Sequence, residues 1–318
     1  MSKLYLKFML MLAPLLLIGC GSPVNLSAQK PAKSSFLIDA KSFPPLPNAQ
    51  KAENGILVYK VKLGNDDDAG KVWIYLPEDQ KSGKFPAVLI TAAGSYLWNG
   101  TSLDEDDMPE HLPYARKGYA VIAYETPGSL DKTDLKNIPD APLIKAISDF
   151  KASRAGLDNQ QNALNYALDK VSLIDPERIF IAGHSSAATH ALLAAANDPR
   201  IKAVMAYAPA TDLEKRLAKF PGAFEQDVPG FSNFIAQSSP KNNIAKIKCP
   251  VFIFQSESDS AVPAADTKAF VTELKKSNAN VTFETVTEGD HYESMITEGI
   301  PKGLAWLNNL ALRSNNTK

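Results

Sequence analysis

A serine set among small residues is the feature of this sequence best suited to covalent chemistry. Residues 178–187 read Arg-Ile-Phe-Ile-Ala-Gly-His-Ser-Ser-Ala, which is typical of a strand, a tight turn and the start of a helix. Such a turn exposes the central serine hydroxyl only if the residues two before and two after it are small. Gly183 and Ala187 meet this requirement. The pattern therefore predicts Ser185 as a nucleophile.

Two other interpretations of the same run stay open. Small residues around a serine also serve ordinary packing of a strand against a helix, so the pattern alone does not establish a nucleophile. Ser186 is a rival, but centring the pattern on it places the bulky His184 two residues before the serine. A base and an acid farther along the chain decide between these readings, because this architecture carries them in the order serine, acid, histidine.

His291 is the histidine that fits the required order. It follows the strand-like segment 281–286, which places it on a loop beyond a strand. The other histidines precede the serine, lie in the turn, or lie on the following helix: His111, His184 and His190. A lone loop histidine can also be merely solvated, but beside the serine turn it predicts a general base that takes the proton of Ser185.

Asp259 is the acid expected between the serine and the histidine. It lies in a short loop after the hydrophobic strand 250–254. A carboxylate there accepts a hydrogen bond from the imidazole, fixes its tautomer and stabilises the imidazolium. Glu257, two residues earlier, is the main competitor. Asp290 adjoins His291 in sequence and is interpreted as a loop acid.

Strands and helices alternate around these residues. Strands are expected at 56–63, 72–76, 87–90, 120–124, 203–207, 251–254 and 281–286, and helices at 159–171, after residue 185, at 266–276 and at 301–312. This alternation requires right-handed crossovers and a mostly parallel sheet. We expect one α/β domain over residues 51–318, with a small cap insertion at about 211–246.

The span from about 85 to 310 resembles the α/β-hydrolases of the prolyl oligopeptidase and dienelactone hydrolase type. The similar segments lie before the serine turn, after its helix, at the acid strand and at the histidine loop: 175–179, 198–204, 247–263 and 289–291. The resemblance implies an α/β-hydrolase fold, with a mostly parallel central sheet flanked by helices. It also implies Ser185 as nucleophile, Asp259 as acid and His291 as base.

The chain departs from this family at the loop that completes the oxyanion hole. Many relatives carry His-Gly-Gly after the strand that ends near residue 90, whereas this chain has Thr-Ala-Ala-Gly at 91–94. Backbone donors need no particular side chain, so the N–H groups of Ser186 and Ala93 are expected to form the oxyanion hole. Alanine is less tolerant than glycine of unusual backbone angles, which bears on the Ala93 donor.

Aromatic residues near these loops are candidates for substrate binding. Tyr96 and Trp98 follow the oxyanion loop directly, and Phe224 and Phe231 lie in the insertion. The alternative is that these side chains only pack the loop and the insertion onto the core. The acidic run 104–107 is expected to be a solvated loop, and neither a metal site nor a cofactor is implied.

The N-terminus indicates export. Residues 1–19 combine lysines with a short apolar run, as in a signal peptide, and Leu-Ile-Gly-Cys at 17–20 resembles a bacterial lipoprotein box. Cys20 is therefore the expected lipidation site, 20–50 the expected flexible tether, and the cell envelope the expected location. An ordinary signal peptide cut elsewhere is the alternative. The net charge of −1 implies no nucleic-acid partner.

Together these features predict a serine hydrolase acting on small-molecule carboxylic esters through an acyl-enzyme. A serine peptidase of the prolyl oligopeptidase type is the first alternative, although such relatives usually carry a propeller domain that this sequence does not show. A lipoprotein that keeps the fold but only binds is the second. The oligomeric state is left open.

Overall fold

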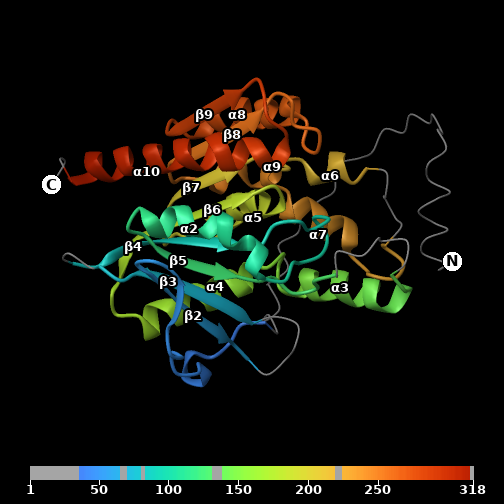
Figure 1. Cartoon of the computed structure of the whole chain (residues 1–318). Coiled ribbons are helices and arrows are strands. Elements are labelled where there is room, and N and C mark those ends of the chain that lie inside the picture. The colour runs from blue at the N-terminus through green and yellow to red at the C-terminus, as the bar shows by residue number, and fades with distance from the viewer. Residues whose placement is uncertain (1–35, 65–69, 80–82, 131–137, 219–223, 316–318) are drawn as a thin grey trace, which may run out of the picture.

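The computed structural model describes residues 36–64, 70–79, 83–130, 138–218 and 224–315. The predicted signal peptide and Cys20 lie outside these residues, so both stay predictions. Figure 1 shows one sheet running through the molecule, with helices packed against both of its faces. This is the layered arrangement that alternating strands and helices produce.

The sheet is antiparallel at one side and parallel through the rest. Its strands lie in the order β1, β2, β3, β5, β4, β6, β7, β8, β9. Neighbours from β1 to β5 pair antiparallel, and neighbours from β5 to β9 pair parallel. The bounds are β1 Gln50–Glu53, β2 Ile56–Lys62, β3 Lys71–Pro77, β4 Phe85–Thr91, β5 Ala120–Tyr124, β6 Ile174–His184, β7 Ile201–Tyr207, β8 Val251–Ser256 and β9 Val281–Val286. The predicted α/β fold with a mostly parallel sheet is confirmed.

Helices cover the two faces unequally. The bounds are α2 Met108–Arg116, α3 Asp140–Ala152, α4 Leu157–Lys170, α5 Ser186–Ala195, α6 Leu213–Arg216, α7 Phe231–Ser238, α8 Ala264–Ser277, α9 His291–Ser294 and α10 Ile300–Asn315. Helices α3 to α8 supply the apolar core on one face, whereas α2 and α10 supply the core on the other. Successive strand residues point to opposite faces, so Ile74 joins the first core and Tyr75 the second.

The segment 36–49 packs on the domain, although the sequence places it in the flexible tether. Asn162 on α4 accepts a hydrogen bond from the Ile38 N–H at 3.1 Å and donates to the Phe36 carbonyl at 2.7 Å. The buried Phe43 ring meets the Tyr166 ring edge-on at 5.5 Å. The folded structure therefore begins before the boundary predicted near residue 50, because the hydrogen bonds with Asn162 and the buried Phe43 ring attach this segment to α4.

The insertion at 211–246 contains α6, α7 and the 3₁₀ segment Pro240–Lys246, with residues 219–223 outside the described part. Its buried aromatic and aliphatic side chains belong to the same core as α3 and α4. Within the described residues, no helix has the length and apolarity needed to cross a membrane.

Candidate active site

Ser185 occupies a sharp turn between β6 and α5. Its backbone has φ 55° and ψ −119°, outside the regions that a non-glycine residue ordinarily adopts. The Ser185 N–H donates to the Tyr207 carbonyl at 2.8 Å, which holds this conformation. A Cβ at Gly183 would lie 2.4 Å from the Ala187 carbonyl oxygen, so the turn closes only with glycine there. Ser185 is partly exposed, as a nucleophile must be.

His291 and Asp259 form a hydrogen-bonded pair. The imidazole Nδ1 lies 2.8 Å from Asp259 Oδ2, and the side chains are 18 % and 1 % exposed. Since an ionised carboxylate can only accept, Nδ1 carries the proton and Nε2 is left with a lone pair. This is the tautomer that a general base requires. The pair comes from two loops that follow β8 and β9, at the same end of the sheet as Ser185.

Four hydrogen bonds hold the Asp259 carboxylate. Oδ2 also accepts from Gln255 Nε2 at 2.8 Å, and Oδ1 accepts from the N–H groups of Ala261 and Val262, each at 2.8 Å. Burial opposes ionisation, but these bonds and the one from His291 outweigh it and lower the pKa of Asp259. Asp259 is therefore anionic and fixed in orientation near neutral pH.

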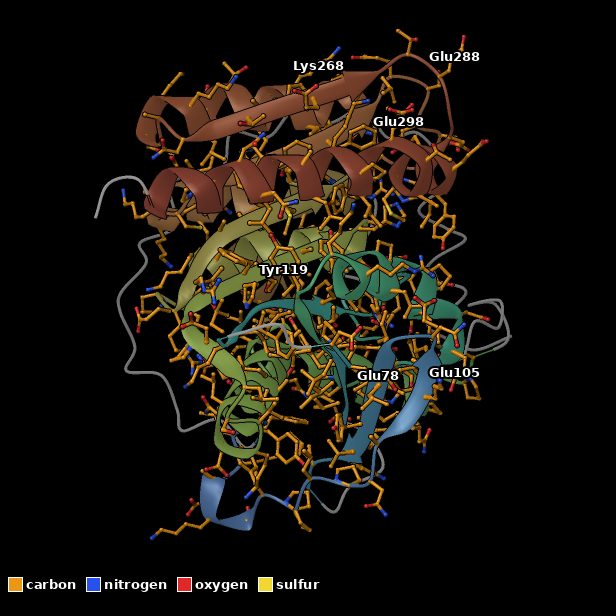
Figure 2. All side chains as sticks on the ribbon, turned by 60° about the vertical axis from the view of Figure 1, so that its left-hand side comes forward. Glu78, Glu105, Tyr119, Lys268, Glu288 and Glu298 are labelled. Carbon is orange, nitrogen blue, oxygen red and sulfur yellow. The ribbon has the colours of Figure 1, made fainter. Side chains whose placement is uncertain are left out.

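Gln255 supports the Asp259 carboxylate and is not among the residues predicted from the sequence. Its fully buried side chain donates to Asp259 and accepts from Thr267 Oγ1 at 2.9 Å. A polar residue near the end of the otherwise hydrophobic strand β8 was the available indication. The competing acid Glu257 instead forms an ion pair with Lys268 of α8 at 2.7 Å, and Lys268 is labelled on the outer part of the molecule in Figure 2.

Asp290 ties the histidine loop to the acid loop. Its Oδ1 accepts from the His291 N–H at 2.7 Å and from the Ser260 N–H at 2.9 Å. The N–H bonds and the Ser260 hydroxyl lower the pKa of this exposed carboxyl. Asp290 thus contacts the backbone of His291, while Asp259 contacts its ring.

The side chain of Ser186 holds the loop after β4. Its Oγ accepts from the N–H groups of Gly94 and Ser95, each at 3.0 Å. The Ser186 N–H lies in the first turn of α5, where backbone donors have no acceptor within the helix. Sequence reasoning assigned Ser186 only this backbone donor and missed the role of its hydroxyl.

The Ala93 N–H, in the loop after β4, donates to no atom of the described residues. From Ala92 to Leu97, the other N–H groups of this loop have acceptors. Ala92 donates to the Tyr124 carbonyl, Gly94 and Ser95 to Ser186 Oγ, Tyr96 to Asn99 Oδ1 and Leu97 to Ser95 Oγ. The Ser186 Oγ bonds place Gly94 and Ser95 against the turn that carries Ser185. This supports Ala93 as the second oxyanion donor.

The predicted substrate-contacting aromatics separate into one exposed residue and a buried row. Tyr96 is 39 % exposed and stacks on Trp98 with ring centroids 5.4 Å apart. The side chains of Trp98, Phe224 and Phe231 are 2 %, 0 % and 4 % exposed. The Phe224 ring contacts both the Trp98 ring and the Phe231 ring. These three side chains pack the insertion onto the oxyanion loop, which corrects their predicted role. Tyr292, next to His291, is a second exposed aromatic residue at the site.

The other histidines are buried. His190 lies 2.8 Å from the Tyr124 hydroxyl and 3.0 Å from the Ala155 carbonyl, and His111 lies 3.3 Å from the Tyr75 hydroxyl. Burial lowers the pKa of His190 to about 4 and that of His111 to about 3. Both are neutral core residues. His184 contacts the ring of His291.

The described residues contain no group of three or more His, Cys, Asp or Glu side chains arranged to hold a metal ion. In the acidic run 104–107, Asp104 and Asp107 cap each other's backbone N–H groups, and Glu105 pairs with Lys60 at the surface labelled in Figure 2. Burial raises the pKa of the Cys249 thiol to about 11, so it is not a reactive thiolate.

Two family models match the chain over its catalytic region. The prolyl oligopeptidase family matches residues 145–311, and the acetyl xylan esterase (AXE1) family matches residues 42–221. Each match spans more than half of the 318 residues. The first contains Ser185, Asp259 and His291, and the second contains Ser185 and the oxyanion loop. No curated protein sequence matches the chain significantly.

Solved structures show the same fold at low sequence identity. Acetyl xylan esterase 1 from Thermoanaerobacterium is 16 % identical, with a TM-score of 0.58 over 84 % of this chain and 88 % of that one. An S-formylglutathione hydrolase from Agrobacterium tumefaciens is 17 % identical, with a TM-score of 0.61 over 83 % and 98 %. An acylaminoacyl peptidase from Pyrococcus horikoshii is 17 % identical, with a TM-score of 0.60 over 78 % of this chain but 39 % of its own.

The sheet order, the strained turn at Ser185 and the two family matches lead to one assignment. The chain belongs to the α/β-hydrolase superfamily of serine hydrolases, in the group described by the prolyl oligopeptidase and acetyl xylan esterase families.

Proposed function

We propose that this protein hydrolyses carboxylic esters through a triad of Ser185, His291 and Asp259. The observation that carries the proposal is the 2.8 Å bond between His291 Nδ1 and Asp259 Oδ2, at the same end of the sheet as a serine held at φ 55°. A buried, fully hydrogen-bonded aspartate and a singly protonated imidazole are the partners that a serine nucleophile needs.

In this mechanism His291 Nε2 removes the Ser185 proton as Oγ attacks the ester carbonyl. The negative charge that develops on the carbonyl oxygen is received by the N–H groups of Ser186 and Ala93. Asp259 stabilises the imidazolium, which then protonates the departing alcohol. Water, activated by the same imidazole, releases the acid from the acyl-serine.

Esters of short acids are the proposed substrates. The acetyl xylan esterase match includes the serine turn, and the small esterases among the structural neighbours align over most of their own length. Tyr96 and Tyr292 are the exposed aromatic surfaces beside the oxyanion loop and the base, and we propose that they contact the alcohol part of the substrate.

Hydrolysis of p-nitrophenyl acetate, butyrate and octanoate, compared with aminoacyl p-nitroanilides, tests this function. We expect the acetate to have the highest kcat/KM and Ser185→Ala to lose about 10⁶-fold in kcat. Ser277→Ala, on the surface of α8, is the matched control and should keep full activity. Anilide cleavage faster than ester cleavage would favour a peptidase, in keeping with the prolyl oligopeptidase match.

Labelling with a fluorophosphonate separates an enzyme from a binding protein. The wild-type chain should be labelled and Ser185→Ala should not. A correctly folded wild type that is neither labelled nor active would contradict the proposed function.

We further propose that the protein is an exported lipoprotein acylated at Cys20. The basis is the signal-peptide pattern of residues 1–19 followed by Leu-Ile-Gly-Cys. Growth with an alkynyl palmitate analogue should label the wild type, and Cys249→Ala should remain labelled. Cys20→Ala should be unlabelled and leave the membrane fraction, whereas label retained by Cys20→Ala would refute the assignment.

A further inference from the structure

A buried histidine and a buried carboxyl lie directly behind the proposed base. His184 Nε2 is 3.1 Å from the His291 carbonyl oxygen, and the two imidazole rings lie 4.4 Å apart at 44°. On the other side of the ring, His184 Nδ1 lies 4.0 Å from Glu110 Oε1 of α2. The side chains of His184 and Glu110 are 5 % and 12 % exposed.

Hydrogen-bond chemistry fixes the tautomer of His184. A carbonyl oxygen only accepts, so His184 Nε2 must carry the proton that faces His291. Burial, with a further contribution from the neighbouring His291, lowers the pKa of His184 to about 3, so the ring is neutral. Its Nδ1 therefore presents a lone pair to Glu110.

The Glu110 carboxyl suits this lone pair only when it is protonated. A carboxylate would face the lone pair with negative charge, whereas a protonated carboxyl donates an O–H after a small shift or through a bridging water. In the described residues, the Glu110 carboxyl makes no hydrogen bond, and it forms no ion pair with a Lys or Arg side chain. A small cavity adjoins it, lined also by Ile90, Tyr114, Tyr207 and Met295.

The groups around Glu110 are neutral or anionic. Asp107 caps α2, Tyr114 lies one turn along α2, Tyr207 faces it from β7 and Tyr292 from α9. The Tyr114 and Tyr207 hydroxyls bond each other at 2.7 Å, and His184 itself stays neutral. Burial first, and the Asp107 charge second, raise the pKa of Glu110 to about 8.

We propose that protonated Glu110 and His184 position the base His291, and that ionisation of Glu110 releases the histidine loop and lowers activity. The proposal rests on the proposed function of His291. On ionisation, Glu110 draws the His184 proton to Nδ1, which leaves an Nε2 lone pair against the His291 carbonyl. The bond that holds the loop is then replaced by a repulsion.

The direction of the pH effect follows from the raised pKa of Glu110. Below about pH 8 the carboxyl is protonated and the loop is held. Above it the carboxylate forms, so kcat should fall about tenfold between pH 7.5 and 9.5, with KM little changed.

The test is Glu110→Gln, whose amide donates to Nδ1 at every pH and cannot titrate. The kcat of Glu110→Gln for p-nitrophenyl acetate, divided by the kcat of the same variant at pH 7, should stay constant between pH 7.5 and 9.5. The same ratio should fall for the wild type. Glu105→Gln, an exposed residue near the same helix, is the matched control and should keep the wild-type profile. A Glu110→Gln profile that falls like the wild type would overturn the proposal.

Hydrogen exchange of the peptide spanning 287–295 is a readout independent of catalysis. Corrected for intrinsic rates, exchange should accelerate above pH 8 in the wild type and not in Glu110→Gln. This measurement remains valid if Ser185→Ala shows the hydrolase assignment to be wrong. Equal exchange in both proteins at every pH would refute the loop release.

His184 variants test the positioning step separately. His184→Phe keeps an aromatic ring but removes the donor, so kcat should fall 10- to 100-fold with KM unchanged. His184→Asn restores a donor and should recover part of that loss. If His184→Phe fails to fold, the Glu110→Gln profile still decides the proposal.

Discussion

The Ser186 side chain joins two segments that are more than ninety residues apart in sequence. Its backbone N–H is one proposed oxyanion donor, and its Oγ accepts the two N–H groups that follow the other donor. The side chain of Ser186 therefore also sets the distance between the two proposed oxyanion donors. The position of Ser186 at the start of a helix predicts its backbone donor. The role of its hydroxyl depends on where the loop after β4 lies in the folded protein, which the sequence does not show.

Ser186→Ala is the variant that isolates this bridge. It keeps the backbone donor but removes the acceptor of the exposed Gly94 and half-buried Ser95 N–H groups, a loss of about 0.5–1.5 kcal/mol for each hydrogen bond. We expect kcat for p-nitrophenyl acetate to fall about 10- to 100-fold, less than the loss expected for Ser185→Ala. Ser277→Ala serves again as control. Unchanged kcat in a correctly folded Ser186→Ala would contradict the bridge.

At the site, the order of residues along the sequence predicts a nucleophile, an acid and a base from their side-chain chemistry alone. Ser185, Asp259 and His291 follow from a small-residue turn and from the order of acid and base. Gln255 was missed although it lies only four residues from Asp259, because the strand pattern does not show that its amide is buried against the acid loop. Glu110 lies on α2 and reaches His184 at the end of β6, a long-range contact that local patterns do not carry.

At the scale of elements, patterns of apolar residues located the strands well. The seven strands predicted by their ranges are present, with their ends within two residues of the expected positions, and β6 begins four residues before the strand expected from 178. Helix α2 was not predicted, because Pro113 lies in its interior, where proline is a poor helix former. The short edge strand β1 and helix α3 were also missed, since neither has a strong periodic pattern. These elements depend on the sheet and the core beside them.

The serine turn gives a prediction for the β6–α5 junction. A methyl group at Gly183 would meet backbone atoms of Ala187, which cannot rotate away. Gly183→Ala should therefore lower the free energy of unfolding by about 1–3 kcal/mol and reduce kcat at least tenfold. Urea unfolding and steady-state kinetics measure the two effects.

Gly118→Ala is the control for this variant. At Gly118 an added methyl meets nothing within 4 Å, but φ is +87°. It should destabilise by about 1 kcal/mol through backbone strain alone and leave kcat unchanged. If both variants behave alike, close packing of the turn is not what makes Gly183 necessary.

The contact of segment 36–49 with α4 extends the folded domain toward the N-terminus. Phe43→Ala removes a buried ring that packs on Tyr166, so urea unfolding should show a loss of about 3 kcal/mol. Leu37→Ala changes a 45 % exposed side chain of the same segment and should stay within about 0.5 kcal/mol of the wild type. A small effect at Phe43 would mean that the segment adds little to the fold.

For the whole molecule, the buried histidines predict the response of stability to acid. The pKa values of His111, His184 and His190 are lowered to about 3, 3 and 4, below the ordinary value of 6.5. The unfolded chain therefore takes up protons first as the pH falls below about 6.5. Each histidine should cost about 1.4 kcal/mol per pH unit down to its folded pKa.

Urea midpoints at pH 7, 6, 5 and 4.5 measure this loss. The urea midpoint should fall at each step. In His190→Gln, the fall of the midpoint from its pH 7 value should be smaller than in the wild type. Glu110 acts in the opposite sense, since its raised pKa makes stability fall as the pH rises from about 4.5 to 8. A midpoint that is constant between pH 7 and 5 would contradict the buried, neutral state of the histidines.

The buried row of Trp98, Phe224 and Phe231 restricts where new specificity can arise. Enlarging or shrinking any of these rings disturbs the core that supports the oxyanion loop, so selection for new substrates meets a folding penalty there. Tyr96 and Tyr292 are exposed and border the same chemistry, so they can vary at little cost to stability. Libraries that randomise these two positions should therefore yield altered ester preference in folded protein far more often than libraries aimed at the row.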